Sequence, residues 1–196
     1  MAYRFTSAPL TPDTWADLEA LAARRGSTVL RSCWCMFYRT TGDFGLTVAS
    51  GPEHREDLRR VVDAGESPGI LGYVDGEAAG WISLGPRPEY PRLDASRMMR
   101  VVDDTPVWSI VCSFVGSDYR GRGVQRRLLT AAVDFARDHG VRTLEAYPVD
   151  KAGRSDNGSM WWGSRSLYEK AGFREVARRS PTRLVMRRTL RPRTSA

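Results

Sequence analysis

The segment from residue 119 to 125 has the residue types and spacing best suited to chemistry. It reads Tyr-Arg-Gly-Arg-Gly-Val-Gln and lies between an apolar strand pattern and an amphipathic helix pattern. Glycines at such a junction let backbone N–H groups turn toward a ligand, and a helix start adds a partial positive charge. Arg120 and Arg122 add two full charges. The segment predicts a phosphate or pyrophosphate site, although an ordinary helix start has the same pattern.

Two familiar nucleotide-binding loops do not fit this segment. A dinucleotide-binding loop has the pattern Gly-x-Gly-x-x-Gly after the first strand, whereas this segment lacks the third glycine and comes late in the chain. A P-loop needs Gly-Lys followed by Ser or Thr, and the sequence contains no Gly-Lys pair. The phosphate site predicted here therefore belongs to another class of protein.

The three cysteines and two histidines do not predict a metal site. Cys33 and Cys35 are too close in sequence for an ordinary disulfide, and zinc needs about four nitrogen or sulfur ligands. His54 and His139 fall in separate predicted helices. We therefore expect no metal and reduced thiols, as in cytoplasmic proteins. A nucleophilic cysteine is the weaker hypothesis, because no histidine stands beside one.

Hydropathy and charge limit the kinds of partner that the protein is expected to bind. No apolar run approaches the roughly 20 residues of a membrane-spanning helix, and the N-terminus lacks a signal-peptide pattern, so we expect a soluble cytoplasmic protein without a membrane partner. The net charge of +7 resides entirely in residues 174–196, which hold eight Arg and one Glu. Such a segment can bind nucleic acid, but the run from Arg183 to Arg187 has a strand pattern. We therefore expect no nucleic-acid partner.

The order of the predicted elements sets the fold class. Strands are expected at about 3–7, 70–74, 77–84, 107–115, 141–147, 176–178 and 183–190, and helices at about 12–25, 52–64, 124–139 and 163–171. Asp75-Gly76 predicts a tight hairpin turn, and residues 107–147 predict a parallel strand-helix-strand crossover. Residues 33–38 are either a strand or a buried connection. Together these elements predict a single α+β (mixed α/β) domain over residues 1–196, with a mixed, mostly antiparallel sheet of about six to seven strands and about four helices.

Two motifs in the second half of the chain resemble the GCN5-related N-acetyltransferase (GNAT) superfamily. The first is the phosphate segment with its flanks, from Phe114 to Leu129, which matches the family pattern Arg/Gln-x-x-Gly-x-Gly/Ala at all but its last position. The second runs from Ser166 to Phe173 and reads Ser-Leu-Tyr-Glu-Lys-Ala-Gly-Phe. Both occur in the family's order. The resemblance implies a single N-acetyltransferase domain that uses acetyl-CoA as cosubstrate.

The resemblance also implies where acetyl-CoA binds. The pantetheine would lie along the end of the strand that precedes the phosphate segment, and the pyrophosphate on the turn that follows. The implied binding residues are Ser113, Phe114, Val115, Arg120, Gly121, Arg122, Gly123, Val124, Gln125 and Ser164. Gln125 departs from the family, which has Gly or Ala there. Trp161 occupies the region of a family asparagine, whose contact Ser164 or Ser166 would replace.

The resemblance further implies direct attack of an amine on the thioester. Tyr168 takes the place of the family's proton donor, and a phenol with a pKa near 10 suits a thiolate leaving group. The alternative is a buried packing tyrosine. Glu145 is the best-placed carboxylate for a general base, followed by Asp103 and Asp104. A salt-bridged Glu145, with water relaying the proton, is the alternative.

These features predict an acyltransferase that moves the acetyl group of acetyl-CoA to a primary amine of a small molecule or peptide. The resemblance also suggests a homodimer. The competing hypothesis is a non-catalytic acyl-CoA sensor, or a nucleic-acid-binding protein that uses the Arg-rich C-terminus. The aromatic residues Trp34, Phe37, Tyr38, Trp161 and Trp162 are candidates for an acceptor pocket or for the core.

Overall fold

The computed structural model describes residues 3–42, 50–150 and 161–191. These residues form a seven-stranded sheet in the order β1-β2-β3-β4-β5-β7-β6. The strands are β1 (Phe5–Pro9), β2 (Gly69–Val74), β3 (Glu77–Pro86), β4 (Trp108–Val115), β5 (Thr143–Ala146), β6 (Arg174–Ser180) and β7 (Arg183–Thr189). Only β4 and β5 pair in parallel, and the other neighbours are antiparallel. The predicted mixed, mostly antiparallel sheet is confirmed.

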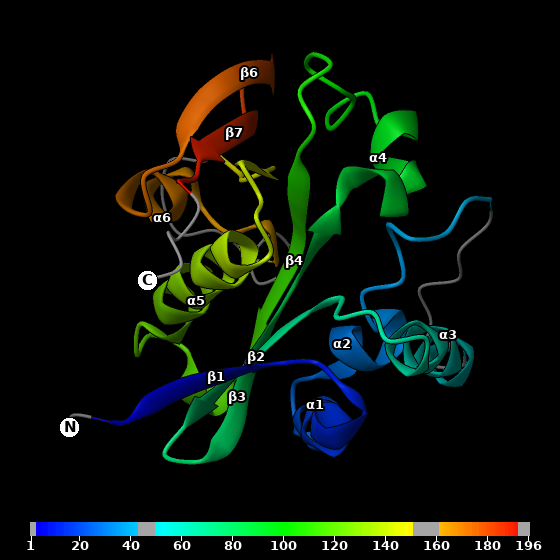
Figure 1. The fold of residues 1–196 in the computed structure, drawn as a ribbon. Coiled ribbons are helices and arrows are strands. Elements are labelled where there is room, and N and C mark those ends of the chain that lie inside the picture. The colour runs from blue at the N-terminus through cyan, green and yellow to red at the C-terminus, as the bar shows by residue number, and fades with distance from the viewer. Residues whose placement is uncertain (1–2, 43–49, 151–160, 192–196) are drawn as a thin grey trace.

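Helices cover both faces of this sheet, with α1 to α3 on one face and α5 on the other (Figure 1). The α-helices are α1 (Trp15–Ala23), α2 (Thr28–Cys33), α3 (Gly51–Asp63), α4 (Pro91–Ala95), α5 (Val124–Asp138) and α6 (Arg165–Lys170). Short 3-10 helices are η1 (Pro12–Thr14), η2 (Arg87–Glu89) and η3 (Ser117–Tyr119). The described residues thus hold six α-helices where the sequence predicted about four.

The long helix α5 forms as predicted because its apolar residues recur at helical spacing. Its buried side chains are Val124, Leu128, Leu129, Ala132, Val133, Phe135 and Ala136. They pack on the face of the sheet opposite α1 to α3. Gly123 precedes the helix with a φ of +81° and Gly140 follows it with a φ of +71°. The crossover from β4 through α5 to β5 therefore places the start of α5 beside the end of β4.

The two helices that the sequence did not predict are both short. Tertiary packing against α3, rather than a local sequence signal, accounts for α2. The two helices are so close that a Cβ on Gly51 of α3 would come within 2.2 Å of the Arg31 carbonyl oxygen of α2. The helices can therefore approach this closely only with glycine at that position. In α4, Pro91 occupies the first helical position, where proline starts a helix rather than only breaking the chain. Of residues 33–38, Cys33 ends α2 and residues 34–38 form the mostly buried connection, not a strand.

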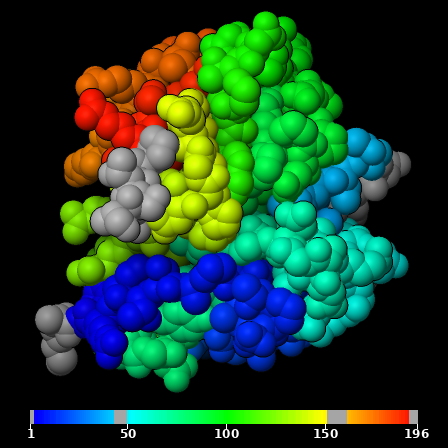
Figure 2. All heavy atoms as spheres, viewed as in Figure 1, coloured from blue at the N-terminus to red at the C-terminus, as the bar shows by residue number. Residues whose placement is uncertain are grey.

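The outer strands β1 and β6 lie at opposite edges of the sheet. In the space-filling view, the N-terminal region with β1 and the region with β6 and β7 likewise lie at opposite ends of the molecule (Figure 2). The parallel pair β4 and β5 is therefore interior to the sheet, with several strands on each side.

Candidate active site

The parallel strands β4 and β5 separate before β4 ends. They pair only from Trp108 to Ile110 of β4, against Leu144 to Ala146 of β5. Soon after β5, Pro148 lacks the N–H donor that a continued ladder would need. From Val111 to Val115, β4 therefore has no β5 partner on this side. Ladder groups at such an opening can bond to a ligand with amides of its own.

The turn that follows β4 presents backbone donors. Gly121 and Gly123 have φ of +74° and +81°, and nothing lies within 4 Å of where a Cβ would stand on either. The N–H groups from Gly121 to Val124 donate to no backbone acceptor in the described residues. The first intrahelical bond nearby runs from the Arg127 N–H to the Gly123 carbonyl at 3.2 Å. Free amides at the start of a 15-residue helix form an anion site.

Four exposed arginines surround this turn, namely Arg120, Arg122, Arg126 and Arg127. Arg120 Nε donates to the Val115 carbonyl at 3.1 Å, which ties the turn to β4. The guanidinium groups of Arg122 and Arg127 lie over the Tyr3 ring at 5.1 and 5.2 Å. Within the described ranges, none of the four forms an ion pair with a carboxylate. Their charge is therefore available to an anionic ligand.

Gln125 and Ser113 are brought together by this arrangement. Gln125 Nε2 donates to Ser113 Oγ at 3.0 Å, and the Ser113 hydroxyl donates to the Trp161 carbonyl at 3.3 Å. The side chain of Gln125, where the family has Gly or Ala, thus braces α5 against β4. On β4, Phe114 packs toward α1 to α3 and Val115 toward α5. Binding by the segment 113–115 would therefore rest on its backbone.

Tyr168 lies in the short helix α6, beside the same strand. Its side chain is buried, and its ring packs edge-on against Phe173 with centroids 5.1 Å apart. Burial, and then the neighbouring Cys112 thiol of β4, raise the pKa of the Tyr168 hydroxyl. The phenol therefore stays protonated next to β4. Ser164 caps this helix, since its Oγ accepts the Leu167 N–H at 3.3 Å.

Glu145 lies on β5 within a buried ion-pair network. Its Oε1 accepts from Arg87 Nη1 at 2.9 Å and from the Tyr147 hydroxyl at 2.7 Å, and its Oε2 accepts from Arg187 Nε at 2.8 Å. Glu145 has no exposed surface. Both oxygens are engaged, so proton removal from an amine would first require a donor to leave. The geometry fits the salt-bridged alternative, while the base role stays a prediction.

Other charged residues have their partners in or near this network. Asp103, the second candidate base, binds Arg187 Nη1 at 2.7 Å. Sequence reasoning missed Arg87, which joins Glu145, Tyr147 and Asp94, because a lone Arg between two prolines carries no signal of burial. In the Arg-rich C-terminal region, Arg187 thus pairs internally, and Arg178 pairs with Asp150 and Glu175. These two arginines therefore have carboxylate partners and add no unpaired charge to a basic surface.

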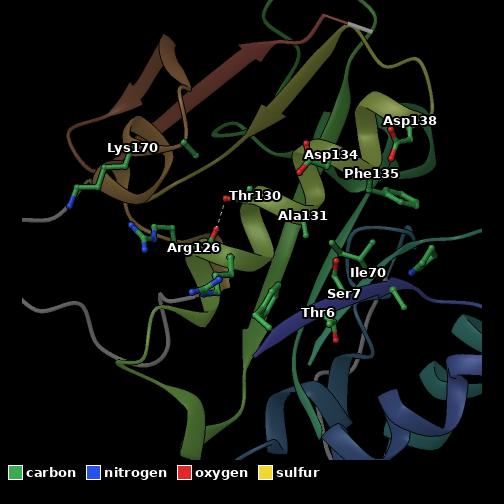
Figure 3. Close-up of a pocket in the computed structure, with 15 residues that line it drawn as sticks. Thr6, Ser7, Ile70, Arg126, Thr130, Ala131, Asp134, Phe135, Asp138 and Lys170 are labelled. Atoms are coloured by element: carbon green, nitrogen blue, oxygen red, sulfur yellow. Dashed lines mark hydrogen bonds between the residues drawn. The ribbon is translucent and has the colours of Figure 1, made fainter. Parts of the chain in front are cut away.

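A hollow of about 720 Å³ lies away from the strand opening, between β1 and the exposed side of α5 (Figure 3). Arg126, Asp134, Asp138 and Lys170 are among its lining residues. It touches the first turn of α5 but takes no residue from β4. The hollow therefore does not reach the strand opening, and the candidate site remains at β4.

The described residues contain no group of three or more His, Cys, Asp or Glu that could hold a metal ion. Across the same part of the chain, no helix has the length and apolar character that crossing a membrane requires. Glu145 and His54 are two buried residues of types that can bind metals, but each has a protein partner instead. The Glu145 carboxylate accepts from Arg87, and His54 Nδ1 hydrogen-bonds to the Ser32 backbone carbonyl.

The fold and site define an α+β protein with a turn of free backbone amides beside an opened parallel strand pair. The model of the acetyltransferase (GNAT) family matches residues 34–173, well over half of the chain. The chain therefore belongs to the GNAT acetyltransferase family. Acetyl-CoA-dependent N-acetylation is the general activity of that family.

Solved structures agree on the fold. A ribosomal-protein-alanine N-acetyltransferase from Brucella melitensis is 22% identical, with a TM-score of 0.54 over 94% of this chain and 99% of that one. The PaiA N-acetyltransferase from Thermoplasma acidophilum, in complex with coenzyme A, is 14% identical, with 0.53 over 95% and 99%. A GNAT-family acetyltransferase from Streptococcus pneumoniae is 16% identical, with 0.51 over 95% and 99%. No curated protein sequence matches the chain.

Proposed function

We propose that this protein transfers the acetyl group of acetyl-CoA to a primary amine. The observation that carries this proposal is the free-amide turn from Gly121 to Val124, which directly follows the unpaired end of β4. A pyrophosphate needs hydrogen-bond donors and positive charge, and a pantetheine needs amide partners along an extended strand. The groups that a pyrophosphate needs and those that a pantetheine needs both lie at the end of β4. The CoA complex of the PaiA N-acetyltransferase, a protein of the same fold, supports the choice of ligand.

In this proposal the turn and its arginines hold the pyrophosphate, and the backbone of residues 113–115 holds the pantetheine. Gln125 keeps the turn and the strand in register through its bond to Ser113. Ser164 caps α6, the helix that carries Tyr168. Acetyl-CoA, when bound, supplies an acetyl group activated as a thioester. A backbone N–H near Phe114 would polarise its carbonyl.

The transfer itself needs few protein groups. The amine nitrogen bonds to the acetyl carbon, the carbon–sulfur bond breaks, the amine loses one proton and the sulfur gains one. Tyr168 donates a hydrogen bond to the departing sulfur, because its raised pKa keeps the phenol neutral. Full proton transfer from Tyr168 alone would be uphill, since a thiol has an ordinary pKa near 8.5. We propose that water carries the proton lost by the amine to the departing sulfur, which thereby becomes a thiol, while Glu145 maintains the network at β5.

The substitution Tyr168→Phe tests this assignment. It removes one hydroxyl and keeps the ring packing on Phe173, so the variant should fold with an unchanged melting temperature. We expect kcat in an acetyl-CoA thiol-release assay to fall about 100-fold, with little change in the KM for acetyl-CoA. Tyr73→Phe on β2, which loses a hydroxyl bound to Asp17 instead, serves as the control and should keep its kcat. Equal kcat for Tyr168→Phe and the wild type would remove Tyr168 from the mechanism.

A further inference from the structure

A small apolar cavity lies against β4 on the side of the sheet that carries α1 to α3. Its volume is about 170 Å³, and none of its eleven lining residues is a carboxylate, a lysine or an arginine. Val111, Cys112 and Phe114 of β4 form one wall. The other walls come from α2, from the connection after it and from Trp161 and Trp162.

The cavity adjoins the strand segment that we assign to the thioester. On β4, Ser113 points toward α5 and bonds to Gln125, whereas Cys112 and Phe114 line the cavity. A register shift between β3 and β4, next to Val111, brings Val111 and Cys112 to the same wall. The Tyr168 ring and the Gln125 amide both lie beside Gly163, and Gln125 bonds to Ser113, the chain neighbour of Cys112. The cavity, the strand opening and Tyr168, the proposed hydrogen-bond donor to the sulfur, therefore converge on one stretch of β4.

The wall facing β4 is held in an unusual backbone conformation. Trp34 and Cys35 both have positive φ, at 46° and 52°. Each non-glycine residue in this region costs about 1–2 kcal/mol, and such strain clusters at functional sites. Trp34 turns away to stack on Trp15, and Cys35 faces the cavity, where its Sγ accepts the Trp81 Nε1 proton at 3.2 Å. The strained turn at Trp34 and Cys35 therefore forms part of the cavity wall.

Two contacts involve the polar groups around Trp162, which lines the cavity. Trp162 Nε1 donates to the Tyr38 hydroxyl at 2.9 Å. The Arg183 guanidinium stacks over the Trp162 ring, 3.7 Å from its centroid. A second ammonium group on an acceptor would find no anionic partner here, and an unpaired buried charge is costly. The lining therefore disfavours polyamines and aminoglycosides.

The size of the cavity sets the size of its occupant. An apolar cavity of about 150 Å³ is large enough to bind benzene. Given the proposed acetyl transfer, on which this inference rests, we propose that the acceptor is a small primary amine with an apolar, phenyl-sized substituent that occupies this cavity. The amino group would then project past Cys112 toward the opening between β4 and β5.

The first experiment compares acceptors in a thiol-release assay. Benzylamine carries one phenyl ring, ethanolamine replaces it with a hydroxyl group, and spermidine adds further charges. We expect kcat/KM for benzylamine to exceed that for either polar amine by about tenfold or more. Preference for ethanolamine or spermidine would overturn the cavity assignment and leave the proposed acetyl transfer intact.

The second experiment measures binding without turnover. Benzylamine binding is followed by calorimetry in the wild type, in Val29→Trp and in Val176→Trp. Val29 lines the cavity mouth and is 39% exposed, whereas Val176 is 43% exposed on β6 and lines no part of the cavity. We expect Val29→Trp to weaken benzylamine binding about tenfold and Val176→Trp to leave it unchanged, with melting temperatures confirming that both fold.

The two experiments separate the two proposals. Benzylamine binding that depends on Val29, without acetylation of any amine, would support the cavity and overturn the proposed acetyl transfer. Benzylamine binding that is absent from the wild type, or unaffected by Val29→Trp, would overturn the cavity assignment whatever the enzyme acetylates.

Discussion

Two arginine-rich regions of this protein satisfy their charges in opposite ways. In the network at β5, Arg87 and Arg187 enclose Glu145, and their guanidinium groups are bound by carboxylates at 2.7 to 2.9 Å. At the start of α5, Arg120 and Arg122 are exposed and have no carboxylate partner among the described residues. A buried charge needs a partner because an uncompensated charge in the interior is costly, whereas an exposed charge without a partner is available to an anionic ligand. The number of arginines in a region does not distinguish these roles, but their partners do.

The largest effect should follow from breaking the paired region. Glu145→Gln leaves Arg87 and Arg187 partly buried without their shared anion, so we expect the free energy of unfolding to fall by about 3–5 kcal/mol. Urea denaturation measures this change. Asp63→Asn removes the partner of Arg59 in an exposed pair on α3 and should cost about 0–1 kcal/mol. A Glu145→Gln variant of normal stability whose kcat collapses would instead assign Glu145 to proton removal.

A smaller effect should separate the two ends of α5. Gly123 and Gly140 both have positive φ and open space around a Cβ, so alanine at either position should cost about 1–2 kcal/mol of stability. Only Gly123→Ala disturbs the free amides, so only this variant should bind CoA more weakly, by about tenfold. Calorimetry on both variants checks the difference. Equal CoA affinity for the two would mean that the turn does not hold the pyrophosphate.

The smallest effect should be on the stability of the protein at acid pH. It concerns Asp103, an exposed residue of the ion-pair network around Glu145. The hydrogen bond from Arg187 lowers the pKa of Asp103 from 3.8 to about 2. A lowered folded-state pKa stabilises the protein above the unfolded value, and this contribution disappears as pH falls through the folded value. Asp103→Asn should therefore lower the melting temperature slightly at pH 6, with the difference vanishing near pH 2. A difference independent of pH would contradict this ion pair.

Much of the candidate site around the α5 turn could be predicted from the sequence because its signals are local. The glycines at 121 and 123, the apolar stripe of α5 and the Asp75-Gly76 hairpin each depend on residues close together in the chain. Local periodicity and turn chemistry are sufficient for such elements. The roles assigned to Tyr168 and Ser164 came from a motif and stay predictions.

The paired region could not be predicted, because its contacts are long-range. Arg87 and Glu145 are 58 residues apart, and they meet only because β3, β4 and β5 align side by side. In sequence, Glu145 looks like any polar residue of a strand. The apolar cavity has the same origin, since α2, β4 and Trp161 to Trp162 come from distant parts of the chain. Burial of these residues is a property of the assembled sheet.

The most direct test of the contrast is the affinity for CoA after charge removal. Arg120→Gln/Arg122→Gln removes two unpaired charges at the turn, and Arg59→Gln/Arg60→Gln removes two paired charges on α3. Calorimetric titration with CoA should give a Kd about tenfold or more higher for the first variant, because each charge-assisted hydrogen bond contributes about 1.5–3 kcal/mol. The second variant should match the wild type. Equal Kd values for wild type and both variants would contradict the assignment of the α5 turn as the CoA site.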